Sequence, residues 1–151
     1  MASLVDDLND LLARARAGCE AARLLAHEIE RSDPDIDRGL EDIIDIERWS
    51  SSGLYHRITQ LDGTPSLAVN TFPDRVAAKT DLRERLKMLC NEQEAVARQA
   101  KHVLLRDDLD QATRDLLTEF REVHLRNAAW CSRIMRQWEP DRAPGHGRRE
   151  R

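Results

Sequence analysis

Apolar residues recur every three or four positions along most of this chain, and this period predicts amphipathic α-helices. The stripe is clearest at the start, where it continues without a break from Leu4 to Ile29. It returns in three later stretches, each long enough for several helical turns. Prolines, glycines and short polar runs separate these stretches. We therefore expect four long helices, at residues 2–31, 34–61, 80–105 and 109–138.

Two of the three connections between these helices are short polar turns. In the first turn, Asp33 is suited to cap the second helix and Pro34 to occupy its first position. The second turn contains Asp107 and Asp108, and an Asp there can cap the fourth helix. Turns this short make the helices that they join antiparallel neighbours. Gly63 is expected to stop the second helix.

The remaining connection, residues 62–79, differs from the others in length and composition. Pro65 and Pro73 interrupt any regular pattern, although residues 74–78 can add a helical turn. Eighteen extended residues reach roughly 59 Å, whereas the second predicted helix is only about 40 Å long. A crossover along the whole helix explains this length. The pattern thus predicts an all-α fold, a four-helix bundle with a long crossover between the second and third helices.

The last residues of the chain have a different composition from the predicted bundle. Residues 139–151 contain two prolines, two glycines and no apolar period. Such a segment cannot bury enough apolar surface to order itself. We expect one domain at residues 1–138 and a disordered tail at residues 139–151, with a basic end that we interpret as solvated.

Two helical hairpins joined by one long crossover form the ferritin-like version of the four-helix bundle. Four segments carry a resemblance to this family: LLARARAGCEA, ERWSSSGLYHRITQLDGTPS, DLRERLKMLCNEQEAVARQ and LLTEFREVHLRNAAW. The chain resembles a ferritin-like domain of a small, uncharacterised bacterial family from about Leu4 to Trp138. In di-iron members of the fold, the resemblance implies a Glu on each of two helices and Glu-x-x-His on each of the other two.

This ligand set is not intact, because no Glu-x-x-His motif occurs anywhere in the chain. Glu47 occupies an inward position of the second helix, but Ser50 stands where the motif has His. Glu122 and His124 are two residues apart, a spacing that splays their side chains on a helix. The inward central positions of the first helix carry small residues such as Cys19. The chain therefore has the scaffold of a di-iron protein with a broken ligand pattern.

Polar residues nevertheless occupy the central inward positions of the later helices. A carboxylate on a core face costs several kcal/mol unless it is paired, protonated or bound to a metal, so Glu47 needs a partner. Our leading interpretation is a buried hydrogen-bond network in which His124 or another donor satisfies Glu47 and fixes the register of the helices. The residues of this predicted layer are Glu47, Ser50, Gln93, His124 and Asn127.

Three alternatives remain open. The first is a reduced mononuclear metal site, in which Glu47 and His124, assisted by Glu92 or Glu122, would hold iron or manganese. In the second, the apolar stripe is displaced by one position and Glu47 lies on the surface. The third is a pocket for a small apolar ligand, opened by the small residues of the first helix.

The composition restricts the partners. The 151 residues include 24 basic and 28 acidic side chains, and this balance gives no electrostatic case for binding nucleic acid. No apolar run approaches the roughly 20 residues that would span a bilayer, so no membrane partner is expected.

Cys19, Cys90 and Cys131 lie far apart within apolar helical patterns. We expect buried, reduced thiols in a cytoplasmic protein.

A scaffold with an incomplete ligand set favours a non-catalytic module that acts as a structural unit or through an unidentified protein partner. No cofactor is expected for such a module. Trp49 lies off the apolar stripe of the second helix, which is compatible with a second apolar face and a homodimer contact. The alternative function is a divergent iron- or manganese-dependent oxidase or oxygen-handling protein that uses Glu47 and His124.

Overall fold

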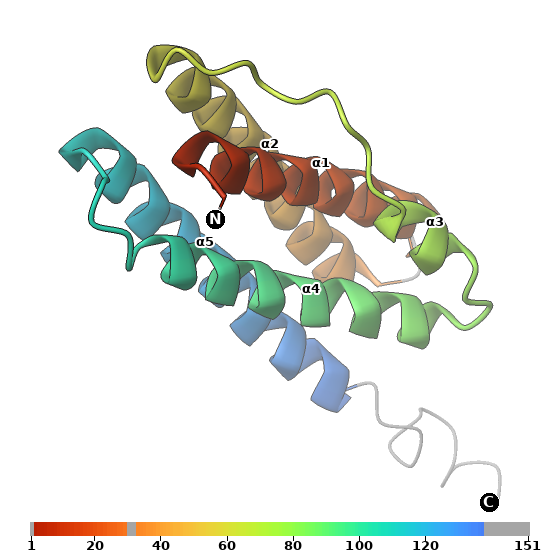
Figure 1. The fold of residues 1–151 in the computed structure, drawn as a ribbon. Helices are drawn as coiled ribbons and strands as arrows, with labels where there is room; N and C mark the ends of the chain where they lie inside the picture. Colours follow the sequence, from red (N-terminus) through yellow and green to blue (C-terminus); the bar gives the residue numbers. More distant parts are fainter. Residues whose placement is uncertain (1, 30–32, 138–151) are drawn as a thin grey trace, which may run out of the picture.

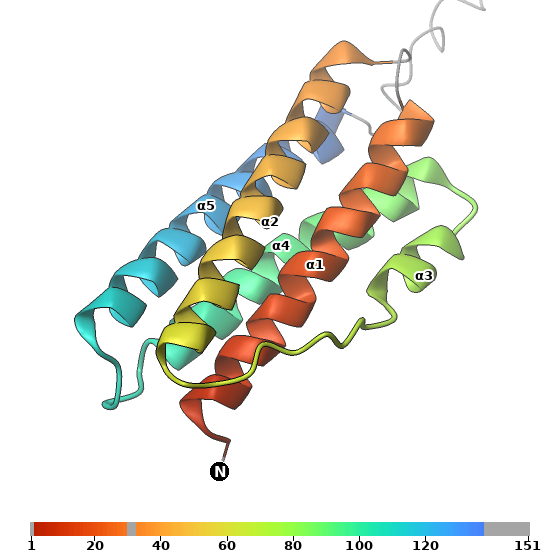
Figure 2. The same cartoon turned by 90° about the horizontal axis from the view of Figure 1, so that it is seen from above.

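The computed structural model describes residues 2–29 and 33–137, and this part of the chain contains five α-helices and no strand. Four helices are long and lie side by side, while a short one lies beside the first (Figures 1 and 2). The all-α class is therefore confirmed, and each long helix begins within two residues of its expected start. The expected ends at residues 31 and 138, and the tail at 139–151, lie outside the described residues. The helices are α1 Leu4–Ile29, α2 Pro34–Gln60, α3 Phe72–Ala77, α4 Leu82–Val103 and α5 Gln111–Gln137.

Polar contacts near the helix ends show how α1 and α4 run relative to each other. Arg106, just after α4, donates a hydrogen bond of 2.9 Å to Asp7 near the start of α1. Arg85, near the start of α4, forms an ion pair with Glu28 near the end of α1. The start of each helix thus lies beside the end of the other. The two helices are antiparallel, as Figure 2 also shows.

The long connection between α2 and α3 runs along the outside of α1 (Figures 1 and 2). Asn9 of α1 holds it in place, because its amide donates to the Thr64 carbonyl (3.1 Å) and its oxygen accepts from the Ser66 backbone N–H (2.7 Å). The Arg16 guanidinium also donates to the Ser66 carbonyl. The connection therefore returns along α1 toward the end of the structure where α4 begins.

The short helix α3 covers a part of α1 that is rich in small residues. Phe72 and Val76 of α3 are buried in the same apolar cluster as Ala17 and Ala21 of α1. The sequence predicted at most one helical turn, at residues 74–78, whereas the helix begins at Phe72 and ends at Ala77. The small residues here accommodate side chains of α3, so the alternative of a pocket for a small apolar ligand has no support at this position.

Aspartates cap three of the long helices. The Asp33 carboxylate accepts hydrogen bonds from the backbone N–H groups of Asp35 (3.0 Å) and Ile36 (3.3 Å), so the predicted cap of α2 is confirmed. Asp81 caps α4 in the same manner. At the start of α5, however, the carboxylate that accepts from the Thr113 N–H (2.8 Å) belongs to Asp110. The expectation of a cap within residues 106–108 was wrong, because α5 begins later than its pattern indicated.

The end of α2 has the geometry of a Schellman motif. The backbone N–H of Gly63 donates to the Ile58 carbonyl (2.9 Å), and that of Asp62 donates to the Thr59 carbonyl (3.0 Å). The residue in the left-handed region is Asp62, with φ of 61°. Gly63 was expected to end the helix, but its role is different. A Cβ atom at Gly63 would lie 2.8 Å from a methyl group of Val5, so the glycine permits close packing on α1.

The core consists of two apolar clusters on either side of the helix mid-points. One contains Leu25 and Leu40 and lies toward the turn between α1 and α2. The other contains Leu8 and Leu54 and lies toward the start of α1. Among the described helices, none combines the length and apolar character that crossing a membrane requires. The region between the two clusters is polar and is the candidate site.

Candidate functional site: a buried polar layer

The mid-points of α2, α4 and α5 carry polar side chains that are buried in the core. Glu47, Gln93 and His124 are at most 1% exposed, and Asn127 is 5% exposed. Glu47 is therefore an interior residue, and the alternative that placed it on the surface is wrong. We call Glu47, Gln93, His124 and Asn127 the polar layer, because hydrogen bonds join all four.

Short hydrogen bonds connect the polar layer from one end to the other. Nδ1 of His124 lies 2.7 Å from the Phe120 carbonyl oxygen, and Nε2 lies 2.6 Å from Oε1 of Glu47. The Gln93 amide donates to Oε2 of Glu47 (3.1 Å), and the Asn127 amide donates to Oε1 of Gln93 (2.8 Å). Both carboxylate oxygens of Glu47 and both ring nitrogens of His124 consequently have partners within the protein.

The hydrogen-bond partners restrict where the protons lie. A carbonyl oxygen can only accept, so Nδ1 of His124 carries a proton that it donates to Phe120. The contact between Nε2 and Glu47 then contains one further proton, held by the imidazole or by the carboxyl group. In both arrangements the two side chains together carry no net charge. The pair thus avoids the large cost of an isolated charge in the core.

The helix α1 contributes a glycine to the polar layer. A Cβ atom added at Gly18 would lie 1.9 Å from Oε2 of Glu47, which is closer than two non-bonded heavy atoms can approach. Gly18 therefore makes the space that the carboxylate occupies. The small residues in this part of α1 are visible in the sequence, but the contact between Gly18 and Glu47 is not, because it depends on how two separate helices meet.

An aromatic ring adjoins the layer on its other side. The imidazole of His124 stacks on Phe120, with the ring centroids 4.2 Å apart and the planes 29° from parallel. Phe120 is fully buried and belongs to the cluster toward the start of α1. Weakly polar surroundings of this kind strengthen the hydrogen bonds of the layer and raise the cost of breaking any one of them.

Ser50 is buried one helical turn after Glu47, as the sequence predicted, but it is not joined to the polar layer. Its hydroxyl group has no hydrogen-bond partner within the described residues. A buried hydroxyl without a partner costs free energy. Ser50 therefore belongs to the same region of the core without contributing to the hydrogen-bond chain.

The two auxiliary metal ligands considered from the sequence have other surroundings. The Glu92 carboxylate accepts two hydrogen bonds of 2.9 Å from Arg14 of α1, and this contact raises the pKa of the Arg14 guanidinium. Glu122 is exposed. Within residues 2–29 and 33–137, no three His, Cys, Asp or Glu side chains converge as a metal site would require. The structure brings Glu47 and His124 together and leaves Glu92 and Glu122 outside the layer.

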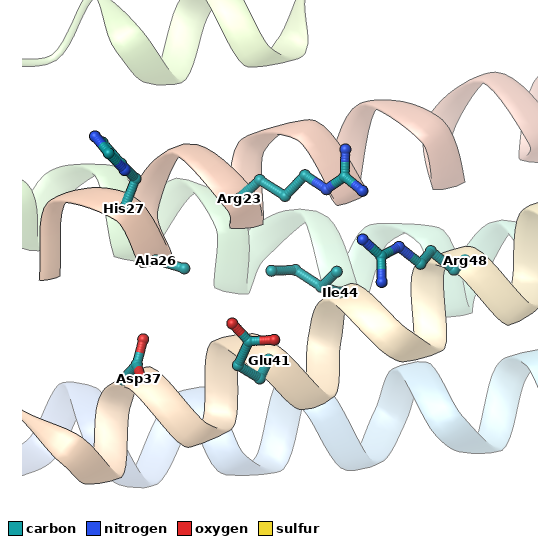
Figure 3. Close-up of a pocket in the computed structure, with 7 residues that line it drawn as sticks. All are labelled: Arg23, Ala26, His27, Asp37, Glu41, Ile44 and Arg48. Atoms are coloured by element: carbon teal, nitrogen blue, oxygen red, sulfur yellow. The ribbon is translucent and has the colours of Figure 1, made fainter. Parts of the chain in front are cut away.

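A surface groove of about 320 Å³ lies between α1 and α2, outside the polar layer (Figure 3). Figure 3 shows the guanidinium groups of Arg23 and Arg48 turned toward each other at one end. Arg23, His27 and Arg48 are all exposed, so the groove is a solvated, charged surface. The lining residues are Arg23, Ala26, His27, Asp37, Glu41, Ile44 and Arg48.

A second close contact of a glycine, between Gly39 and Trp130, was also not predicted from the sequence. A Cβ atom at Gly39 of α2 would lie 1.9 Å from the ring of Trp130, so this glycine lets the indole pack directly on the helix. Trp130 packs against the apolar cluster nearer the α1–α2 turn. Of the three cysteines, Cys90 and Cys131 are buried as expected, whereas Cys19 is only partly buried.

These features define an all-helical protein with a polar centre in its core. The chain belongs to the family described as Domain of unknown function (DUF6306), whose profile matches residues 2–117. The matched part includes Gly18, Glu47 and Gln93 and ends before His124 and Asn127. No significant match was found among curated proteins or among solved structures.

Proposed function

We propose that this chain is a non-catalytic helical module that acts through protein–protein contact, and that its polar layer fixes the packing of its helices. The observation that supports this proposal is that both carboxylate oxygens of Glu47 have hydrogen-bond partners within the core. One oxygen contacts His124 and the other accepts from Gln93, so the polar groups that could bind a substrate or metal are engaged with each other.

The polar layer suits a role in specifying the structure. A shift of α5 along α2 by one turn would separate His124 from Glu47 and leave a charged or polar group unpaired in the core. Removing one partner of a buried ion pair costs about 3–5 kcal/mol, whereas apolar packing alone discriminates poorly between such registers. Buried polar contacts of this kind therefore favour one arrangement of the helices over its neighbours.

The proposed architecture is a four-helix bundle with ferritin-like connectivity. Its support is the order of the elements: α1 and α2 are joined by a short turn, α4 and α5 by another, and the long connection with α3 passes along α1 between them. This order is the one that ferritin-like bundles with a single crossover have. The proposal also includes a cytoplasmic location.

Metal analysis tests the non-catalytic proposal. The full chain is purified from cells grown with excess iron and manganese, beside the variant Glu47→Gln, which keeps the size of the side chain. We expect no stoichiometric iron or manganese in either protein. One equivalent of iron or manganese in the unaltered chain that is lost in Glu47→Gln would overturn the proposal.

The alternative is a divergent oxidase or oxygen-handling protein that uses Glu47 and His124 with iron or manganese. The observation in its favour is the meeting of a carboxylate and an imidazole from two helices, 2.6 Å apart in the core. It predicts an oxo-iron absorption band when the anaerobic protein is loaded with Fe(II) and then exposed to oxygen. The absence of such a band, with no retained iron, would remove this alternative.

The proposed contact surface includes exposed apolar side chains on α2 and α5. Trp49 is 37% exposed and Leu125 is 39% exposed, although large apolar side chains of a monomer usually pack inward. Tryptophan is also enriched at the centres of protein interfaces. We propose Trp49 as part of a contact with a second copy of the chain.

A further inference from the structure

The charged side chains that line the groove between α1 and α2 lack close ionic partners. Within the residues that the structure describes, the side chains of Arg23, Asp37 and Glu41 form no hydrogen bond or ion pair. Arg48 forms an ion pair with Asp45, but its length is 3.9 Å and both residues belong to the same exposed face of α2. Such a pair contributes little to stability. The charges of the groove are therefore available to a partner molecule.

These charges are separated by sign along the groove. Figure 3 shows the guanidinium groups of Arg23 and Arg48 together at one end, and the carboxylates of Asp37 and Glu41 toward the other. The Arg23 side chain extends toward Arg48 and away from Glu41 (Figure 3). Between the two ends, the groove is lined by Ile44, which is 4% exposed. The groove thus has a basic end, an apolar middle and an acidic end.

The spacing on α2 places the two ends symmetrically about Ile44. Glu41 and Arg48 are seven residues apart, which is two helical turns and roughly 10 Å along the helix axis. Residues two turns apart project from the same face of a helix. A twofold rotation about an axis through α2 near Ile44 therefore places Glu41 of one copy opposite Arg48 of another. The same rotation places Arg48 of the first copy opposite Glu41 of the second.

A charge pattern with this symmetry is complementary to itself. In a twofold dimer the same patch of both copies meets, so each residue pair occurs twice. The basic end of each groove would contact the acidic end of the other, and like charges would stay apart. A small ion bound in the groove would remain in water, where its ion pairs are weak. A second copy would instead cover the groove and exclude solvent from the pairs, which strengthens them.

We infer that two copies of the chain associate through this face, with their α2 helices antiparallel and Glu41 of each copy paired with Arg48 of the other. The inference rests on the proposed contact between copies and names its geometry. Trp49 follows Arg48 directly on α2, so its exposed indole lies at the edge of the same face. The indole supplies apolar contact area, while the charges determine how the two copies are oriented.

Charge reversal tests this geometry in the full chain, with sedimentation equilibrium as the measurement. Glu41→Lys and Arg48→Glu each place two pairs of like charges across the twofold axis, so either variant alone should dimerise at least about tenfold more weakly than the unaltered chain. An equimolar mixture of the two variants should recover the affinity of the unaltered chain, because every pair in the mixed dimer again joins opposite charges. Raising the salt concentration should weaken the dimer of the unaltered chain.

Matched controls reverse the same two charges on another helix. Glu94 and Arg98 of α4 have side chains that are 61% and 67% exposed, and Glu94→Lys and Arg98→Glu should each leave dimerisation unchanged. Circular dichroism checks that every variant folds.

The outcomes separate this inference from the contact on which it rests. A dimer that is lost in Trp49→Gln but withstands both charge reversals would overturn the inference and leave the contact through Trp49 in place. Failure of the mixed variants to recover the dimer would overturn the inference as well. A chain that stays monomeric would overturn both the inference and the contact, whereas the non-catalytic role has its own test in the metal analysis.

Discussion

Oε2 of Glu47 lies only 1.9 Å from the point where any residue other than glycine would place its Cβ atom at position 18. A carboxylate of α2 thus uses the absence of a side chain on α1. The opposite oxygen of the same group lies 2.6 Å from Nε2 of His124 on α5. Through this one side chain, three helices constrain one another at the middle of the core.

The contact with Gly18 predicts a large effect of the smallest substitution. Gly18→Ala should destabilise the protein by about 1–3 kcal/mol, because the new methyl group overpacks the site and displaces the Glu47 carboxylate. The matched control is Gly53→Ala on α2, where the Cβ would meet only a terminal methyl group of Leu116 at 3.0 Å. Both changes raise helix propensity equally. Chemical denaturation measures the difference, and equal stability of the two variants would contradict the proposed contact.

The pairing of Glu47 with His124 predicts non-additive effects. Either Glu47→Leu or His124→Leu alone leaves one polar partner buried without the other and should cost about 3–5 kcal/mol. The double variant removes both partners, so its loss should be smaller than the sum of the single losses by at least about 1 kcal/mol. Urea denaturation of the four proteins provides the cycle. Additive losses would mean that the two side chains do not interact.

The end of α2 offers a stabilising substitution. Asp62 adopts a φ of 61°, which favours glycine over residues with a Cβ atom. Asp62→Gly should therefore stabilise the protein by about 0.5–1 kcal/mol. The same change at Asp45, an exposed position inside α2, should destabilise by a similar amount. The Tm values of the two variants test this prediction. A lower Tm for Asp62→Gly than for the unaltered chain would contradict a left-handed conformation at Asp62.

The cap of α5 predicts a pH-dependent effect. Hydrogen bonding from Thr113 lowers the pKa of the Asp110 carboxyl below its usual value. A carboxyl group whose pKa is lower in the folded state contributes stability above its unfolded pKa and loses it as the pH falls through the folded value. Asp110→Ala should therefore lower the Tm at pH 7, and the difference should shrink below about pH 4. Asp107→Ala, in the preceding turn, is the control and should leave the Tm unchanged at both pH values.

The proposed contact between copies of the chain predicts that a substitution there changes the mass of the assembly in solution rather than the stability of the fold. Trp49→Gln should convert a dimer into a monomer in sedimentation experiments while leaving the Tm of the monomer unchanged, because the indole is already 37% exposed. Leu67→Gln, on the long connection and 82% exposed, should have no effect on mass. A monomeric unaltered chain would remove this part of the proposal.

The sequence predicted those features that depend on local periodicity or on a local cap. The apolar period located four long helices, and Asp33 was recognised because an N-cap needs only its own helix. The same period placed Glu47, Gln93, His124 and Asn127 near one height, since each lies close to the middle of its helix.

Other features depend on how separate helices meet, and no local pattern encodes them. The fit of Glu47 against Gly18 and of Trp130 against Gly39 requires the register between helices. The cap at Asp110 was missed because three nearby aspartates are equivalent in sequence, and only the start of α5 distinguishes them. The left-handed conformation fell on Asp62, although the adjacent glycine was the stronger local signal.

The central claim is that His124 is engaged with Glu47 rather than available to a metal. Nitrogen-15 NMR of the chain with labelled histidine tests it most directly, because the chain has five histidines and the other four serve as internal references. Addition of one equivalent of Fe(II) or Mn(II) to the anaerobic protein should leave the ring resonances of His124 sharp and unshifted. Selective loss of those resonances at one equivalent, before any other histidine responds, would contradict the claim and favour a metal site.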